Sequence, residues 1–374
     1  MEKVVVGMSG GVDSSVAAYL LKKQGYDVIG ITMQIWQEED VCSMEENGGC
    51  CGLSAVEDAR RVAAVLDIPY YVMNFKREFK DKVIDYFVSE YLQARTPNPC
   101  IACNRYVKWE ALLKRSLDIG ADYIATGHYA SIAKLPNGRY TIKKSVTQAK
   151  DQTYALYNLT QHQLSHTLMP VGDYPKDVIR EIAGEQGLPV ANKPDSQEIC
   201  FVSDNDYAGF IANYLREKSG TAGSAEDSGS LGNNGLTPGN FINADGAVIG
   251  RHEGLIHYTV GQRKGLGIAM GQPVFVLELR PETNEVVIGN GAQVFSDCLY
   301  AKRLNFMSIE DFEGELEVEA KIRYSHKGAR AKITKTGPDE IRCTFEEPQR
   351  AITPGQAVVF YQGDYVLGGG TILK

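Results

Sequence analysis

Hydrophobic residues recur with two different spacings along the first two hundred positions of the chain. Short apolar runs at residues 3–7, 28–33 and 70–74 predict buried strands, whereas residues 13–24 and 55–66 carry apolar positions at helical spacing. Strands that alternate with helices predict a parallel sheet with helices on both faces. Ligands bind such sheets at the carboxyl ends of the strands, so we expect the chemistry of this part of the chain to lie there.

The pattern changes after about residue 203. Residues 219–240 are rich in Gly, Ser and Asn, which is typical of a loop or a domain boundary. From Pro273 onward, short β-like runs separated by turn residues predict a small antiparallel barrel. We therefore expect an α/β protein with a doubly wound parallel-sheet domain at 1–205, a small central mixed domain at 206–272 and a C-terminal antiparallel β-barrel at 273–374.

The composition is that of a globular protein. Of the 374 residues, 43% are hydrophobic and 23% are charged, and no apolar run approaches the ~18 residues that a membrane helix needs. The first residues enter an apolar strand directly, without the basic and apolar regions of a secretory signal. We expect a cytoplasmic protein without a membrane partner. In that compartment, the eight cysteines are expected to be buried small hydrophobes, metal ligands or reactive thiols rather than a disulfide framework.

The charge balance bears on nucleic-acid binding. A formal net charge of −8 argues against it, because phosphate contacts need Lys and Arg. Residues 321–335, however, contain no Asp or Glu, and alternate residues of a strand would place several of their basic side chains on one face. A solvated barrel face is the alternative interpretation. The basic residues of this strip are Lys321, Arg323, Lys327, Arg330, Lys332 and Lys335, with Arg263-Lys264 and Lys143-Lys144 as further candidates.

A Gly- and Ser-rich turn lies between the first strand and the first helix, at residues 7–15. Its glycines let the backbone approach a phosphate, and the helix N-terminus supplies free N–H groups and a positive dipole end. The Gly-Lys-Ser/Thr ending of a Walker A loop is missing. A tight turn with Ser caps and no ligand is the alternative. Asp13 could hold a metal ion or cap the helix, and the sequence leaves both open.

This turn, Ser-Gly-Gly-Val-Asp-Ser-Ser, resembles the signature of the PP-loop, or N-type ATP pyrophosphatase, family. The resemblance implies that ATP binds with its pyrophosphate in the loop, that AMP is transferred to a substrate oxygen and that pyrophosphate is released. By itself it implies the cofactor and not the substrate. The loop residues concerned are Gly7, Met8, Ser9, Gly10, Gly11, Val12, Asp13 and Ser14.

Two further segments carry thiols in polar, loop-like surroundings. Pro97 and Pro99 set an extended loop before Cys103, which lies just before a helix, where the helix dipole lowers the pKa of a thiol. Cys200 follows about a hundred residues later. Sulfur transfer needs such a pair, because one thiol carries a persulfide and the other attacks its S–S bond. Two alternatives remain: ordinary buried cysteines, or an iron–sulfur cluster held by Cys100, Cys103 and Cys200.

With these segments the chain resembles the tRNA-specific 2-thiouridylases over nearly its whole length. That family acts on the wobble uridine of tRNA. The matching segments, in the family's order, are residues 7–14, 95–104, 125–130, 150–154, 195–201, 258–267 and 347–356.

The resemblance implies a role for each matching residue. Cys103 resembles the nucleophile and Cys200 the persulfide carrier, and a sulfur-donor protein loads the persulfide. ATP with Mg²⁺ occupies the loop, and Met33 and Gly127 line the nucleotide pocket. Asn98, Pro99 and Cys100 face the target base. The residues that resemble tRNA contacts are His128, Lys150, Asp151, Gln152, Arg323, Tyr324 and Gln356.

One position departs from the family's commoner pattern, which has Asp where this chain has Cys100. If that Asp is an acid–base group in the relatives, a thiolate or a cluster replaces it here, or the step needs no such group. Cys42, Cys50 and Cys51 form a second unusual group, which could be a zinc-like cluster, a redox-sensitive loop or a group without chemical role.

Two other functions remain open from the sequence. A PP-loop ligase acting on a small molecule would need neither the paired cysteines nor the basic strip. A non-catalytic iron–sulfur or RNA-binding module would leave the PP-loop signature unexplained.

Overall fold

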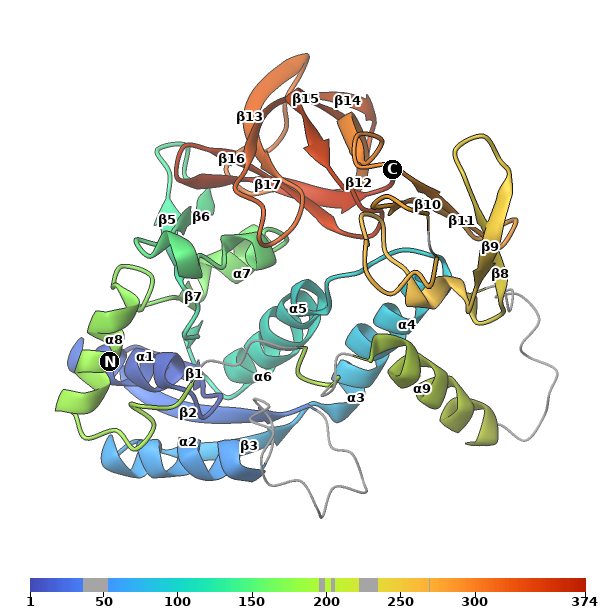
Figure 1. Ribbon diagram of the computed structural model, residues 1–374. Helices are drawn as coiled ribbons and strands as arrows, with labels where there is room; N and C mark the ends of the chain where they lie inside the picture. Colours follow the sequence, from blue (N-terminus) through green and yellow to red (C-terminus); the bar gives the residue numbers. More distant parts are fainter. Residues whose placement is uncertain (36–52, 195–198, 203–205, 222–234, 269) are drawn as a thin grey trace.

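The computed structural model describes residues 1–35, 53–194, 199–202, 206–221, 235–268 and 270–374. A parallel-sheet domain, a smaller β-sheet and a barrel follow one another along the chain, with the barrel packed over one end of the first domain (Figure 1). None of the helices in the described ranges is long and apolar enough to cross a membrane.

The N-terminal sheet has five parallel strands in the order β3-β2-β1-β4-β7. The order reverses direction on either side of β1, which confirms the predicted doubly wound sheet. Its strands are β1 (Lys3–Gly7), β2 (Asp27–Gln34), β3 (Tyr70–Asn74), β4 (Tyr123–Ala125) and β7 (Thr167–Leu168).

Helices cover both faces of this sheet, and alternate residues of β1 enter the two cores. Val4 and Val6 pack with α1 (Val12–Lys23), α2 (Leu53–Val65) and α8 (Lys176–Glu185). Val5 belongs to the second core, on the opposite face. That core is built by α3 (Lys76–Phe79), the π-helix η1 (Lys80–Ile84), α4 (Asp85–Leu92), α5 (Pro99–Ala102), the π-helix η2 (Cys103–Leu112), α6 (Leu113–Asp118), α7 (Gln161–Ser165) and α9 (Tyr207–Thr221).

A second sheet follows, in the order β10-β11-β8-β9. The runs at 275–280 and 285–289, which the sequence pattern grouped with the barrel, pair instead with β8, and the β11–β8 pairing is parallel. A β-like run does not itself tell which sheet it joins, and this partner lies more than forty positions earlier in the chain. The strands are β8 (Gly239–Ile242), β9 (Val248–His252), β10 (Phe275–Arg280) and β11 (Glu285–Gly289).

The C-terminal strands close into a six-stranded antiparallel barrel, as predicted. Their order is β12-β15-β14-β13-β16-β17, and β17 pairs with β12 to complete the ring. The hairpin of β5 (Ala130–Lys134) and β6 (Tyr140–Lys144) extends from the first domain and adds to β17. The barrel strands are β12 (Phe295–Phe306), β13 (Glu315–Lys321), β14 (Ala329–Gly337), β15 (Glu340–Arg350), β16 (Ala357–Gln362) and β17 (Tyr365–Ile372).

Candidate active site

The phosphate loop joins the carboxyl end of β1 to α1. Gly11 caps the helix without a side-chain hydrogen bond, so the first N–H groups of α1 are left for a ligand. Ser14 Oγ accepts a hydrogen bond from the Ser9 amide at 3.2 Å, and Ser15 Oγ donates to Gly11 O at 2.7 Å. Local hydrogen bonds therefore fix the loop while its helix end stays open to an anion.

Two glycines are required by close backbone packing around this loop. Gly10 has a φ of +68°, and a Cβ there would lie 2.3 Å from the Ala55 carbonyl oxygen. A Cβ on Gly127, just after β4, would lie 2.5 Å from the Ser14 nitrogen. The end of β4 therefore lies directly against the N-terminus of α1, and the place of Gly127 beside the nucleotide stays a prediction.

Asp13 is engaged by two side chains from other elements. Lys176 Nζ, at the start of α8, donates to its two carboxylate oxygens at 2.8 and 2.9 Å. The Tyr129 hydroxyl donates to Oδ1 at 2.7 Å. Gly11, not Asp13, is the N-cap of α1, and both carboxylate oxygens of Asp13 bind Lys176.

A second lysine contacts the loop from outside. Lys193 Nζ donates to Gly10 O at 3.0 Å and to Asp58 Oδ2 at 2.7 Å. Arg180 in turn donates to the Lys193 carbonyl at 3.2 Å. The sequence analysis missed Lys193, because no local pattern shows that residue 193 returns to the first loop.

The cysteine segment begins at a well-capped helix. Asn98 Oδ1 accepts hydrogen bonds from the amides of Cys100 and Ile101, and Pro99 occupies the first helical position. The short helix α5 then continues into the π-helix η2 at Cys103. Cys103 is half-buried, whereas Cys100 is exposed. Asn98 therefore has a structural role here beside its expected contact with the target base.

Several residues expected to contact tRNA lie close to the cysteine segment. Burial raises the pKa of the Tyr324 phenol, and the charges of Asp151 and Cys100 raise it further. Asp151 is fixed by Ser145 and Thr153, whose amides donate to it at 2.9 and 3.2 Å. Asp151 and Cys100, from two separate segments, are therefore near enough to Tyr324 to affect its pKa.

The loop before α5 contacts the barrel. Gln356 Nε2 donates to Thr96 O at 2.9 Å, and the Thr96 amide donates to Pro354 O at 2.9 Å. The Thr96 hydroxyl also lies 3.3 Å from the hydroxyl of Thr259, which is in the segment between β9 and β10 of the second sheet. Gln356 therefore holds the cysteine loop in place.

Cys200 is exposed, and its neighbour Phe201 anchors it. The Phe201 ring lies 5.3 Å from that of Phe87 and 5.7 Å from that of Phe79. Residues 195–198 of its motif lie outside the described residues, as do Cys42, Cys50 and Cys51. In the described part of the chain, no three His, Cys, Asp or Glu side chains are arranged to hold a metal ion.

The basic strip is partly neutralised by neighbouring acids. Lys332 Nζ lies 2.7 Å from a Glu315 carboxylate oxygen, and Lys335 forms an ion pair with Asp311. In contrast, Arg323 donates to the uncharged carbonyl of Arg350 at 2.9 Å. For Lys332 and Lys335 the contacts favour the solvated barrel face.

His128 is enclosed by protein contacts. Its Nδ1 lies 2.8 Å from Thr126 Oγ1, and its Nε2 lies 3.4 Å from Lys108 Nζ. Burial, and then Lys108, lower the pKa of His128 well below its usual value. The sequence analysis also missed Lys108, because in an ordinary helix residue 108 would not lie under residue 103.

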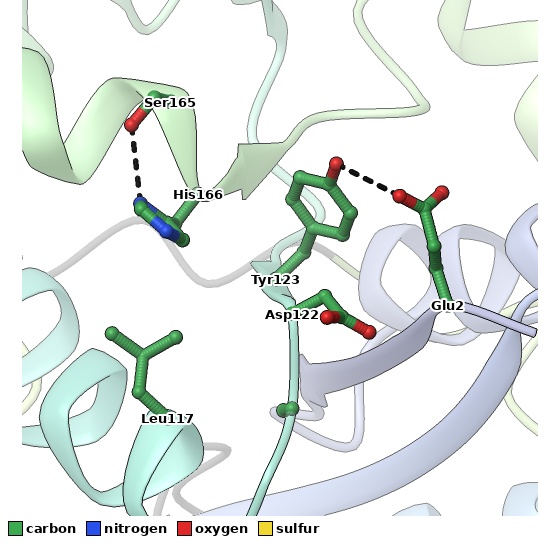
Figure 2. Close-up of a pocket in the computed structure, with 7 residues that line it drawn as sticks. Glu2, Leu117, Asp122, Tyr123, Ser165 and His166 are labelled. Carbon is green, nitrogen blue, oxygen red and sulfur yellow. Dashed lines mark hydrogen bonds between the residues drawn. The ribbon is translucent and has the colours of Figure 1, made fainter.

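A cavity of about 250 Å³ lies at the other edge of the parallel sheet (Figure 2). Its lining includes three residues that each immediately precede a strand of the sheet: Glu2 before β1, Asp122 before β4 and His166 before β7. Tyr123 donates to Glu2 across one side, at 3.2 Å. The cavity is therefore at the amino ends of the strands, whereas the phosphate loop is at their carboxyl ends.

Family models agree with this arrangement. The description "tRNA methyl transferase HUP domain" matches residues 2–204, "tRNA methyl transferase PRC-barrel domain" matches 233–290 and "Aminomethyltransferase beta-barrel domain" matches 296–372. Fold and site thus define a HUP-domain protein of the tRNA-modifying class, with two β-domains after the parallel sheet.

Relatives that match the whole chain identify one family within this class. The chain is 68% identical over 374 residues to the tRNA-specific 2-thiouridylase MnmA of Lachnoclostridium phytofermentans, covering 100% of both chains. It is 56% identical to the protein of the same name from Clostridioides difficile, covering 100% of this chain and 98% of that protein. The chain belongs to the tRNA-specific 2-thiouridylase family, which confirms the resemblance seen in the sequence.

Proposed function

We propose that this chain is a cytoplasmic enzyme that replaces the C2 oxygen of the tRNA wobble uridine by sulfur, using ATP. One observation carries the proposal beyond the family relationship. The helix η2 begins at Cys103 and ends at Leu112, whose side chain packs beside Gly7 of the phosphate loop. A single rigid element therefore connects the nucleophile with the loop that would bind ATP.

The first step activates the base. The C2 carbonyl oxygen attacks the α-phosphorus of ATP, the bond between the α-phosphorus and the bridging oxygen breaks, and pyrophosphate leaves. The loop from Gly7 to Ser14 binds the phosphates through amides, and Met33 and Gly127 line the nucleotide pocket. Mg²⁺ would arrive with the ATP phosphates and neutralise their charge. The Asp13 carboxylate is paired with Lys176, so we assign it no metal-binding step.

The second step transfers sulfur. A sulfur-donor protein loads Cys200 as a persulfide. Cys103 thiolate attacks the Cys200 sulfur, a Cys103–Cys200 disulfide forms, and hydrosulfide leaves to attack C2 and displace AMP. Alternatively, the persulfide attacks C2 directly, and Cys103 then releases the product by forming the same disulfide. In either route the two cysteines supply two electrons, and a thiol reductant must reset them.

The tRNA would reach the site between the first domain and the barrel. Asn98, Pro99 and Cys100 are proposed to face the flipped uridine. The electrostatic effect of Cys100 and Asp151 on Tyr324 supports a common binding place for the anticodon loop. The remaining proposed contacts are Lys150, Gln152, Arg323 and Gln356. Both ring nitrogens of His128 are engaged by Thr126 and Lys108, so we assign it no tRNA contact.

An iron–sulfur cluster held by Cys100, Cys103 and Cys200 is the alternative use of these thiols. Among the described residues the three thiols do not form a metal-binding group, so the arrangement gives a cluster route no geometric support. We therefore derive no step through a cluster.

The decisive experiment is thiolation of unmodified tRNA by the purified protein with ATP and a sulfide source, read by mass spectrometry of nucleosides. The assay compares aerobic protein with protein that has been anaerobically reconstituted with iron and sulfide. ATP-dependent 2-thiouridine in the aerobic form supports the function and the two-thiol route. Product only after reconstitution keeps the function and overturns that route. ATP–pyrophosphate exchange driven by an amino acid, without RNA, would instead indicate a small-molecule ligase.

Variants test the two thiols directly. Cys103→Ser and Cys200→Ser are expected to abolish turnover in the presence of a persulfide donor. Cys298→Ser is the matched control, because Cys298 is a half-buried cysteine in the barrel that contacts Arg342. Full activity in either of the first two variants contradicts the two-thiol mechanism.

A further inference from the structure

Lys108 lies on the element that links the nucleophile to the phosphate loop. A π-helix bonds residue i to residue i+5, so positions five apart, such as Cys103 and Lys108, lie nearly above one another in η2. Leu112, about one helical turn further along η2, packs beside Gly7. The half-buried lysine therefore lies on the helical segment that runs from Cys103 to Leu112.

Two neutral groups hold the Lys108 amine. Its Nζ donates to Asn104 Oδ1 at 2.8 Å and to His128 Nε2 at 3.4 Å. Asn104 is oriented by its own donation to Ala155 O at 2.9 Å. Because an ammonium group only donates, His128 Nε2 is the acceptor, and the ring hydrogen lies on Nδ1 and is donated to Thr126 Oγ1. These contacts fix the direction of the amine.

Within the ranges that the structure describes, the contacts of the Lys108 amine are the neutral groups of Asn104 and His128, and no carboxylate pairs with it. Burial and the nearby lysine lower the pKa of His128 well below its usual value, so the imidazole stays uncharged. An ammonium group has three N–H donors, and the two acceptors use two of them. One hydrogen and a full positive charge remain for an anionic oxygen.

The position of this charge matches one phosphate of ATP. His128 directly follows Gly127, whose backbone lies against the N-terminus of α1. If the loop holds the pyrophosphate portion of ATP, the α-phosphate must lie between the loop and the base attacked near Cys103. Lys108 lies on the helix that spans this interval, and its amine contacts His128, the neighbour of Gly127.

We propose that Lys108 is a catalytic residue that donates a hydrogen bond to a non-bridging oxygen of the α-phosphate. The inference rests on the proposed function and deepens it. The lysine keeps its proton throughout. It neutralises the charge on the α-phosphate while the bond to the C2 oxygen forms and pyrophosphate leaves, and again when AMP leaves from C2. Asn104 and His128 are positioning residues for it.

The experiment measures tRNA-dependent pyrophosphate release, which reports adenylation before any sulfur is transferred. Lys108→Gln removes the charge, Lys108→Arg retains it, and Lys114→Gln is the matched control at an exposed lysine on the adjoining helix α6. Loss of one such donor typically lowers the rate by about 10²–10³. We expect that loss for Lys108→Gln, partial recovery for Lys108→Arg and no change for Lys114→Gln.

A stereochemical readout separates catalysis from structural support. ATP with one α-phosphate oxygen replaced by sulfur exists as two diastereomers, and contact with one oxygen makes the native enzyme prefer one of them. Lys108→Gln is expected to lose this preference, and Lys108→Arg to shift it. A slow variant with the native preference would overturn the catalytic role, as would full activity of Lys108→Gln. If native protein releases no pyrophosphate with tRNA, the proposed function itself fails.

Discussion

Lys193 donates a hydrogen bond to the carbonyl oxygen of Gly10 at 3.0 Å, so the segment leading to Cys200 is bound to the phosphate loop. The two motifs are separated by some 180 positions in the sequence. Gly10 has a left-handed backbone conformation and packs against the backbone of Ala55, and the lysine binds its carbonyl oxygen. The proposed nucleotide loop and the segment before the proposed persulfide cysteine are therefore joined by one direct hydrogen bond.

Lys193→Ala is expected to weaken ATP binding about fivefold. The variant loses one partly exposed hydrogen bond to the loop, worth about 1 kcal/mol, and leaves Asp58 unpaired near the phosphates. Isothermal titration with ATP measures the change. Lys22→Ala is the control, because Lys22 also donates to a backbone carbonyl, Asp67 O at 3.0 Å, but at the far end of α1. Equal effects of both variants would refute a specific role for Lys193.

Gly127→Ala is expected to abolish ATP binding or to lower the unfolding temperature markedly. The added Cβ would meet the backbone of Ser14 and Asp13, which cannot move without displacing the start of α1. Gly184→Ala provides the comparison, since a Cβ at this helical position meets nothing within 4 Å. That control is expected to stabilise the protein by up to about 1 kcal/mol. Thermal unfolding with and without ATP distinguishes the two cases.

Arg323→Gln is expected to weaken tRNA binding and to reduce the slope of log affinity against log salt concentration by about 1. Lys332→Gln is expected to change the affinity less than about twofold, because Lys332 already pairs with Glu315. Filter binding at several salt concentrations measures both. An unchanged salt slope for Arg323→Gln would remove this residue from the set of phosphate contacts.

Stability is expected to decrease as the pH falls from 7 to 5, in part through His128. Its pKa is lowered in the folded state, so below the unfolded pKa of about 6.5 the unfolded chain binds a proton that the folded chain does not. The contribution is complete above that pH and declines below it by at most about 1.4 kcal/mol per pH unit. Denaturant unfolding of native protein and His128→Gln tests this. The variant should show a shallower pH dependence.

Much of this molecule follows from local patterns in the sequence. The apolar run of β1, the Gly-rich turn and the helix after it are adjacent in the chain, and the structure places them as predicted. The partners of β10 and β11 could not be inferred, because strand pairing depends on distant contacts. The ion pairs of Lys332 and Lys335 cross from strand to neighbouring segment for the same reason. Lys108 depends on a π-helix, which no propensity marks.

The joining of β6 to β17 has a consequence for how the enzyme matures. Thr141 Oγ1 donates to Val366 O at 2.6 Å, so the hairpin next to the proposed tRNA-binding segment at 150–152 gains a partner that is synthesised more than two hundred residues later. The ribosome releases the N-terminal domain first, with its phosphate loop and both proposed catalytic thiols already made. That nascent domain still lacks Tyr324, Gln356 and the strand that supports its hairpin. A partly translated chain therefore lacks part of the proposed tRNA-binding surface until translation is nearly complete.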